Sequence, residues 1–251
     1  MAVSDRKVII KEIKKSFETK TGTLNVLDRI SLDIRENEFL VLFGPGQCGK
    51  TVLVNIIAKL EHPNSGEVTY TDNRKVFGNV GLVFQQYAIF PWKTVIENVE
   101  MHEKFRGVPK NQRREEAMEY IKLVGLEGFE HSYPAQLSGG MKQRVGIARA
   151  YATNSDIIFM DEPFGALDAQ TRYQMQEEIL RIWEQKKVTI VFITNNAEEA
   201  VTLGDRIVLL SNKPCKVVQE FTPDLPRPRN NMDQAFLELR NEITSKVDLA
   251  L

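Results

Sequence analysis

The chain has 251 residues, of which 42% are hydrophobic and 27% charged, a composition typical of a globular protein with a sizeable core. Its formal net charge of -1 gives no reason to expect nucleic-acid binding. Two cysteines exclude a disulfide framework and fit a reducing, cytoplasmic setting. Residues 1–15 lack the apolar stretch of a signal peptide, and no window approaches the roughly 18 uninterrupted apolar residues of a spanning helix. If the protein serves a membrane, we expect it to dock onto another chain.

Short apolar runs alternate with helical patterns along the sequence. Two antiparallel strands are predicted first, at residues 8–13 and 30–34. Five further apolar runs predict strands buried on both faces, at residues 39–43, 80–84, 157–160, 188–193 and 207–210. Helical periodicity separates them, at residues 51–60, 112–124, 141–152 and 168–185. The alternation predicts an α/β fold with a mainly parallel sheet and an N-terminal antiparallel β portion.

The predicted core has an insertion and a tail. Residues 87–155 contain helical periodicity, three prolines and no convincing strand, so we expect a helical subdomain between core segments 1–86 and 156–222. Residues 223–251 form the tail. Its three prolines exclude a helix at residues 223–228, and a terminal helix is predicted at residues 232–246.

A phosphate-binding loop is predicted directly after the strand at residues 39–43. Residues 44–51 match G-x-x-x-x-G-K-[ST], where glycines let backbone N–H groups surround phosphates. Lys50 is expected to reach the β- and γ-phosphates of ATP, and the Thr51 hydroxyl to ligate Mg²⁺. Cys48 is either a reactive thiol or, as its place inside the loop favours, a residue with a steric and backbone role. The residues expected around the nucleotide are Gly44, Pro45, Gly46, Gln47, Cys48, Gly49, Lys50, Thr51 and Val52.

Two adjacent acids end the apolar run at residues 157–160. Neighbouring side chains of a strand point in opposite directions, so the two carboxylates are expected to do different work. Asp161 suits the Mg²⁺ shell, and Glu162 suits the general base that activates water. Alone, the pair could equally be two solvated acids at a strand end.

Residues 137–144 read Leu-Ser-Gly-Gly-Met-Lys-Gln-Arg and closely resemble the signature of the ABC-transporter ATPases, Leu-Ser-Gly-Gly followed by Gln-Arg. Ser138 and the glycine amides make a second helix-N-terminal anion site. The resemblance implies the ABC ATPase fold with a P-loop NTPase core. It also implies a head-to-tail ATP sandwich dimer, in which Ser138, Gly139, Gly140 and Gln143 of one cassette cap the γ-phosphate held by the other.

Further positions match this family in order. The resemblance places Phe17 against adenine, although a bare aromatic residue is more often part of a core. It makes Gln85 the glutamine that senses Mg²⁺ and the transmembrane partner, and Asp168 the residue that crosses the dimer interface.

The sequence departs from the family pattern after the run at residues 188–193. The family usually has Thr-His-Asp there, with the histidine on the γ-phosphate, whereas this chain has Thr194-Asn195-Asn196. An amide can donate to phosphate but cannot carry a proton. We therefore expect ATP binding and dimer closure to survive and hydrolysis to be slower than in similar proteins. The loop also differs, with Gly46-Gln47 where importers of this type commonly have Ser-Gly.

Three segments resemble the nitrate, sulfonate and taurine importer ATPases in particular. They are Phe-Pro-Trp at residues 90–92, Gly-Ala-Leu-Asp at residues 165–168 and Leu-Pro-Arg-Pro-Arg at residues 225–229, the last of which could also be a linker with solvated arginines. Bicarbonate importers look alike.

The resemblance implies a peripheral motor on the cytoplasmic face of the membrane. Its partners would be a second cassette, identical or different, two transmembrane permease subunits that dock at residues 85–103, and indirectly a solute-binding protein. Two alternatives stay open: a weakly hydrolysing regulatory cassette paired with a different ATPase chain, and a soluble ABC protein that acts on DNA or the ribosome.

Overall fold

The computed structural model describes residues 6–20, 22–71, 80–85 and 88–249. The chain forms two compact units, which we name the phosphate-loop unit (Met1–Phe77 and Thr189–Leu251) and the signature unit (Gly78–Val188). Gln86 and Tyr87, where the predicted core segment ends and the predicted helical subdomain begins, lie outside the described residues. The predicted division into core, helical subdomain and tail stays a prediction.

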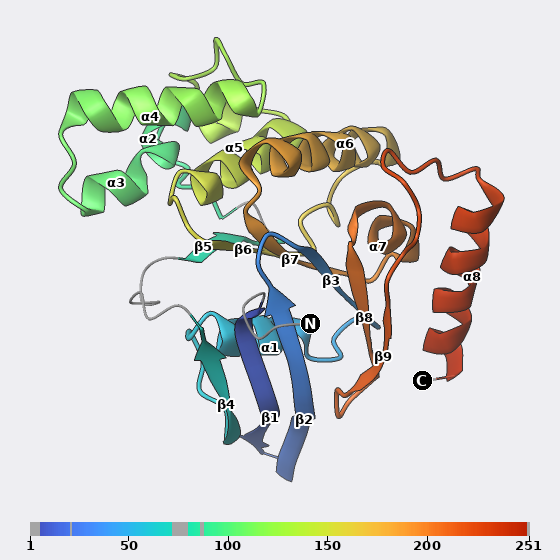
Figure 1. The fold of residues 1–251 in the computed structure, drawn as a ribbon. Helices are drawn as coiled ribbons and strands as arrows, with labels where there is room; N and C mark the ends of the chain where they lie inside the picture. The colour runs from blue at the N-terminus through green and yellow to red at the C-terminus, as the bar shows by residue number, and fades with distance from the viewer. Residues whose placement is uncertain (1–5, 21, 72–79, 86–87, 250–251) are drawn as a thin grey trace. The chain divides into compact units, whose positions relative to one another are not determined.

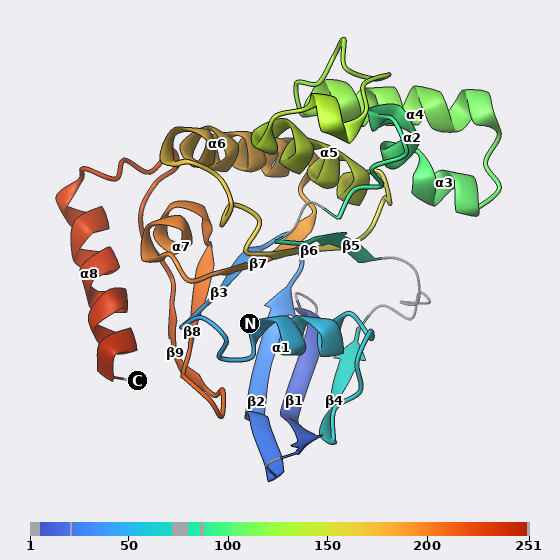
Figure 2. The same ribbon diagram turned by 180° about the vertical axis from the view of Figure 1, so that it is seen from behind.

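The phosphate-loop unit begins with a three-stranded antiparallel sheet in the order β2-β1-β4. Its strands are β1 (Arg6–Thr19), β2 (Gly22–Arg35) and β4 (Ser65–Tyr70). Apolar residues alternate with exposed ones on β1 and β2, so one face of the sheet is buried and the other meets solvent. Helix α1 (Lys50–Ile57) lies beside this sheet in Figure 2 and buries most of its apolar side chains.

The same unit holds a second group of strands with β3 (Phe39–Phe43) at its centre. β3 pairs in parallel with β7 (Thr189–Thr194) on one side and with β8 (Arg206–Leu210) on the other, and β9 (Val217–Phe221) pairs antiparallel with β8. Every residue of β3, β7 and β8 is buried. The prediction of parallel strands buried on both faces is confirmed for these three.

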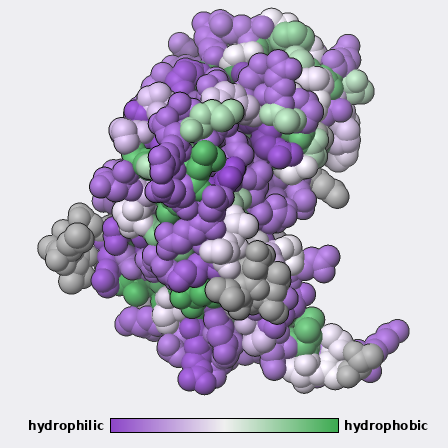
Figure 3. Space-filling model, turned by 90° about the vertical axis from the view of Figure 1, so that its right-hand side faces the viewer, coloured by the Kyte–Doolittle hydropathy of each residue, from purple (hydrophilic) through white to green (hydrophobic). Residues whose placement is uncertain are grey.

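Two helices complete the phosphate-loop unit. The short α7 (Ala197–Leu203) follows β7, and α8 (Gln234–Leu249) packs against it, with Phe236 and Ile243 buried (Figure 1). The prolines at residues 223–228 precede α8 without helix, as expected. The side of the molecule shown in Figure 3 is mostly hydrophilic, with its hydrophobic residues in small separate groups.

The signature unit combines a parallel pair of strands, β5 (Val80–Val83) and β6 (Ile157–Asp161), with helices. Its helices are α2 (Val95–Val99), α3 (Met101–Phe105), α4 (Lys110–Leu123), α5 (Gly139–Tyr151) and α6 (Ala169–Lys186). Helix α5 crosses β5 closely, because a Cβ built on Gly81 would lie 2.9 Å from the Ala150 carbonyl oxygen. Residues 88–155 contain helices and no strand, as the helical periodicity predicts.

Several short elements have no counterpart in the sequence prediction. β4 and β9 are largely exposed strands without an apolar run, and α2, α3 and α7 have at most seven residues each. Pairing with a neighbouring strand or packing against a larger element stabilises such segments, and their own residue pattern is weak. Among the described residues, none of the helices is long and apolar enough to cross a membrane.

Candidate functional site

The phosphate loop closes around the side chain of Lys50. This residue is 4% exposed, and its Nζ donates hydrogen bonds to the carbonyl oxygens of Gly44 (2.8 Å) and Pro45 (2.7 Å). Helix α1 begins at Lys50, so its unpaired N–H groups and the positive end of its dipole lie at the same place. Buried ammonium and helix N-terminus together make a cradle suited to phosphate groups.

Backbone geometry explains which loop positions require glycine. Gly49 has φ +124°, and a Cβ there would lie 2.9 Å from the Val26 side chain. A Cβ on Gly44 would lie 2.8 Å from the Leu210 carbonyl oxygen. Gln47, where similar importers commonly have glycine, has φ 61°, a left-handed conformation that costs a non-glycine residue about 1–2 kcal/mol. The motif allows any residue at this position, so the backbone strain at Gln47 cannot be predicted from it.

Cys48 is buried within the loop next to the second cysteine of the chain, Cys215. A hydrogen bond from the Cys215 thiol and the nearby Lys50 ammonium lower the pKa of Cys48, and the pKa of Cys215 is raised by the same contact and by burial. The thiol pair has no exposed surface. The predicted steric and backbone role of Cys48 therefore fits the structure better than that of an accessible nucleophile.

Asn195 lies beside the phosphate loop. The Gly44 N–H donates to the Thr194 carbonyl oxygen at 3.4 Å, and Asn195 follows Thr194 directly at the exposed end of β7. The Thr194 hydroxyl donates to the buried Glu199 carboxylate at 2.5 Å and accepts from the Asn196 N–H at 3.0 Å. These bonds fix the backbone on both sides of Asn195.

Phe17 stands near the end of β1 with 37% of its surface exposed. The Lys15 ammonium lies 4.8 Å from its ring centroid and also binds the Glu61 carboxylate at 2.8 Å. An exposed ring with one cation at its face is compatible with the predicted stacking on adenine.

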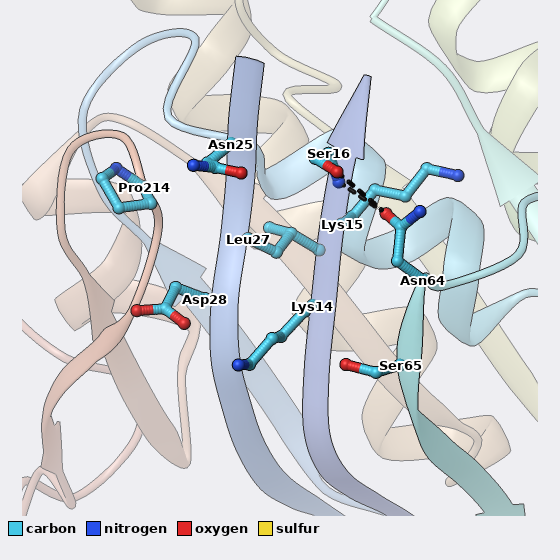
Figure 4. A pocket seen from close by; sticks show the side chains of 9 residues that line it. All are labelled: Lys14, Lys15, Ser16, Asn25, Leu27, Asp28, Asn64, Ser65 and Pro214. Carbon is cyan, nitrogen blue, oxygen red and sulfur yellow. Dashed lines mark hydrogen bonds between the residues drawn. The ribbon is translucent and has the colours of Figure 1, made fainter. Parts of the chain in front are cut away.

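A pocket of about 350 Å³ lies on the three-stranded sheet (Figure 4). Lys15 and Ser16 line it together with Asn25 and Asn64, whose Oδ1 accepts a hydrogen bond from the Ser16 N–H at 2.7 Å. Neither Phe17 nor any residue of the phosphate loop is among the residues that line it. The pocket is therefore a separate polar feature of this sheet that sequence reasoning did not identify.

The signature unit brings the acidic pair and Gln85 together. Asp161 ends β6, and Glu162 turns the chain with a left-handed φ of 43°, a conformation that is often retained at functional sites. A Cβ built on Gly165 would lie 3.4 Å from the Glu162 carbonyl oxygen and 3.6 Å from the Gln85 Nε2. The predicted sensor glutamine thus lies against the turn that carries the predicted general base.

The signature segment and the segment around Asp168 are also neighbours. Ser138 caps α5 by accepting a hydrogen bond from the Met141 N–H at 3.3 Å. Asp168 caps α6, accepting from the Thr171 N–H (3.0 Å) and hydroxyl (2.7 Å), and these bonds lower the pKa of its carboxyl. A Cβ on Gly140 would lie 2.8 Å from Thr171, so the two helix starts lie in contact.

Gln143 differs from the other signature residues in its exposure. It is 1% exposed, and neither its Oε1 nor its Nε2 has a hydrogen-bond partner among the described residues. Its side chain is therefore inside the signature unit, unlike Ser138, which is exposed. Its assignment to the nucleotide of a second cassette stays a prediction.

The predicted Mg²⁺ ligands offer oxygen donors of the expected kind. Thr51 presents a hydroxyl at the start of α1, Asp161 a half-buried carboxylate, and Gln85 an exposed amide. Mg²⁺ is usually held by one or two carboxylates plus substrate phosphates and water. It therefore needs no cluster of three acidic, histidine or cysteine side chains, and the described residues contain none. The residues present fit such an ion.

Comparisons with known proteins show that the chain is similar to ATP-binding proteins of ABC transporters. The family model described as "ABC transporter" matches residues 27–165. An uncharacterized ABC transporter ATP-binding protein of Methanocaldococcus jannaschii is 48% identical, covering 94% of this chain and 90% of that protein. The taurine import ATP-binding protein TauB of Rhizobium johnstonii is 45% identical (90% and 91% covered). The aliphatic sulfonates import ATP-binding protein SsuB of Bacillus cereus is 40% identical (96% of each).

A solved structure resembles the chain as a whole. It is the dimeric, post-hydrolysis state of an ATP-binding cassette bound to ADP and Pi, 32% identical with a TM-score of 0.75, and the match covers 89% of this chain and 99% of that one.

Proposed function

Because the chain belongs to the ABC transporter family and is an ATP-binding ABC ATPase, we propose that it is the motor subunit of an importer for a small solute of the sulfonate or taurine type. Nitrate and bicarbonate are related candidates. Relatives at 40% and 45% identity are named for the import of aliphatic sulfonates and taurine, which supports this class of solute.

Within the phosphate-loop unit, we assign the β- and γ-phosphates of ATP to the cradle of Lys50 and the N-terminus of α1. The buried ammonium supports this role, because it lies where the loop carbonyls already hold it in place. In the phosphate-loop unit the Thr51 hydroxyl would be a ligand for Mg²⁺, which neutralises phosphate charge when bound, and in the signature unit the Asp161 carboxylate is assigned the same kind of role. Glu162 would take the proton of the attacking water, and Asn195 would donate its amide to the γ-phosphate.

The signature segment would act on the nucleotide of a second cassette. Its support is the exposed position of Ser138 at the N-terminus of a 13-residue helix, α5, next to the capped start of α6. The dimeric cassette among the solved structures supports pairing of two such chains. We propose a head-to-tail dimer, peripheral to the cytoplasmic face of the membrane.

The observation that carries the transport part of the proposal is an apolar groove in the signature unit. Its volume is about 370 Å³, and it is lined from β5 to α3 and by α5. Phe105, 82% exposed, and Phe84, 41% exposed, line it with Phe90 and Arg149. It falls within and beside residues 85–103, where docking of the permease is predicted. We propose that a short helix of each transmembrane subunit occupies this groove.

Co-purification tests the groove directly. The chain would be co-expressed with the transmembrane subunits of a taurine or sulfonate importer, and its retention on the detergent-solubilised permease measured. Phe105→Glu is expected to lower retention about tenfold, because it places a charge in an apolar contact. Phe129→Glu is the matched control, since Phe129 is exposed in the same unit but does not line the groove. Equal retention of both variants would contradict the assignment.

Asn195 favours one second candidate, a weakly hydrolysing cassette that pairs with a different ATPase chain. Loss of a group able to carry a proton typically costs about 10²–10⁴-fold in rate. Mg-ATP turnover by the purified chain separates the two candidates. Turnover that disappears in Glu162→Gln supports a homodimeric motor, and ATP binding without turnover supports the mixed pair.

A further inference from the structure

The segment after β9, residues 225–231, runs along helix α7 and is named here the C-terminal arm. Arg229 donates from Nη1 to the carbonyl oxygens of Val201 (2.6 Å) and Gly204 (2.7 Å). Arg227 donates to the Leu203 carbonyl oxygen and pairs with the Asp205 carboxylate. The arm thus satisfies carbonyl groups at the C-terminal end of α7, which the helix cannot satisfy by itself.

The arm also holds the opposite end of α7. Asn231 donates from Nδ2 to the Glu198 Oε1 at 3.2 Å, in the first turn of the helix. Asn196 caps that turn, accepting from the N–H groups of Glu198 (2.8 Å) and Glu199 (3.2 Å). Both ends of this seven-residue helix are therefore tied to one segment.

Asn195 directly precedes Asn196, the N-cap of helix α7. The Glu199 carboxylate of α7 is hydrogen-bonded to the Thr194 hydroxyl, and the Thr194 carbonyl oxygen is bonded to the first glycine of the phosphate loop, Gly44. A rotation or shift of α7 would move Glu199 and Asn196. Because Asn195 lies between Thr194 and Asn196, its backbone would move with them. Interiors this tightly packed transmit such displacements.

We propose that the C-terminal arm is a positioning device for Asn195, with Arg229 and Asn231 as its positioning residues. The inference rests on the proposed function in one respect, that Asn195 contacts the γ-phosphate. Among the described residues, the hydrogen bonds that Arg229 and Asn231 donate go to the arm, to α7 and to its C-cap, and none goes to the phosphate loop. They hold the helix so that the Asn195 amide stays at the end of β7, where an error of about 1 Å can cost a large part of the rate.

The Arg229 side chain of the C-terminal arm is suited to hold α7 in one position at neutral pH. The Arg229 guanidinium donates from Nη1 to two carbonyl oxygens of α7 and its C-cap, and from Nε to the Leu225 carbonyl oxygen at 3.2 Å, a spread of donors on one planar group that the single nitrogen of a lysine cannot reproduce. Burial lowers the pKa of Arg229 to about 10, so the group stays charged at neutral pH. The hydrogen bonds of Arg229 are therefore expected to hold with no pH dependence between about pH 6 and 8.

The first test is hydrogen exchange of the full chain. In Asn231→Ala, the amides of residues 196–199 are expected to exchange several-fold faster, while those of β3 keep their rates. The matched control is Asn241→Ala, because Asn241 is exposed on α8 and its amide is bonded to Arg240 alone among the described residues. Unchanged exchange at residues 196–199 in Asn231→Ala would overturn the proposal.

The second test is a double-mutant cycle on Mg-ATP turnover. We expect Asn231→Ala to lower kcat about threefold and Arg229→Ala about tenfold, with KM for ATP within about twofold of the native value. In an Asn195→Ala background both losses are expected to vanish, because the arm acts through that side chain. Losses of equal size in both backgrounds would mean that the arm only supports the fold, and would overturn the inference.

Failure of the proposed function has a different outcome. It would appear as turnover that is identical in the native chain and in Glu162→Gln, whatever the arm variants do. Exchange at residues 196–199 does not depend on turnover, so it decides the structural step of the inference in that case as well.

Discussion

The phosphate loop and the signature segment are both glycine-rich starts of helices, yet they differ in what surrounds them. At the start of α1, Lys50 is 4% exposed and Gly49 packs against Val26, so the chain itself encloses the cradle. At the start of α5, Ser138 is exposed, and among the described residues its hydroxyl bonds only its own helix, at the Met141 N–H. The first arrangement suits a ligand held by this chain. The second suits a ligand presented by another chain.

Among variants that still bind ATP, the largest effect is expected from the residue that would do chemistry without holding the nucleotide. Glu162→Gln keeps the size of the side chain but removes its ability to accept a proton. Turnover of Mg-ATP is expected to fall about 10²–10⁴-fold, with the Kd for ATP within about twofold of the native value. Steady-state phosphate release and nucleotide titration measure the two quantities. A parallel loss of ATP binding would mean that Glu162 belongs to the enclosed cradle and would break the comparison.

The next prediction tests whether the exposed N-terminus of α5 acts on the nucleotide held by a second chain. Ser138→Arg is expected to lower turnover about 10²-fold, because it blocks one anion-binding helix end, while each chain still binds ATP. Lys50→Ala is expected to abolish turnover through loss of ATP binding. An equal mixture of these two variants should regain about a quarter of native turnover, since half of the dimers would have one intact site of two. No recovery on mixing would place both defects in the same site.

Substitution of Asn195 by histidine gives a smaller effect in the opposite direction. Asn195→His supplies a group that can carry a proton, and turnover is expected to rise about tenfold. The variant should also gain a pH dependence near the ordinary histidine pKa of about 6.5, which the native chain lacks. A rate no faster than native would show that the amide does all that is needed at the end of β7.

The same contrast between enclosed and open segments explains what the sequence could predict of the fold. The run at residues 39–43 was predicted with the bounds that β3 has, because every side chain in it is buried and apolar. β4 and β9 were missed, because they lie largely exposed and owe their conformation to strand partners. The left-handed backbone at Gln47 and Glu162 has no pattern in the sequence, since neither is glycine or asparagine.

The features of the candidate site also divide into those that sequence motifs predict and those that only the fold shows. Spacing predicted the phosphate loop, and the resemblance to the ABC family predicted the roles of the acidic pair and the signature; these assignments stay predictions. Neither could show that Gln143 is buried or that Gln85 lies against the turn at Glu162. The two arginines of the C-terminal arm could have been solvated, and only the fold places them on the carbonyl groups of α7. Contacts between segments distant in sequence are what the motifs leave undetermined.

The smallest effect concerns strain inside the enclosed loop. Gln47 holds φ 61°, which costs about 1–2 kcal/mol for a non-glycine residue, whereas glycine adds about 0.5–1 kcal/mol of backbone entropy cost. Gln47→Gly is therefore expected to raise the free energy of unfolding by up to about 1 kcal/mol. Gly49→Ala, with φ +124° and a clash at Val26, is expected to lower it by more than 1 kcal/mol. Urea denaturation without nucleotide measures both. A less stable Gln47→Gly variant would mean that contacts of the Gln47 side chain outweigh the strain of its backbone, so that the loop would owe part of its closure to a side chain at a variable position of the motif.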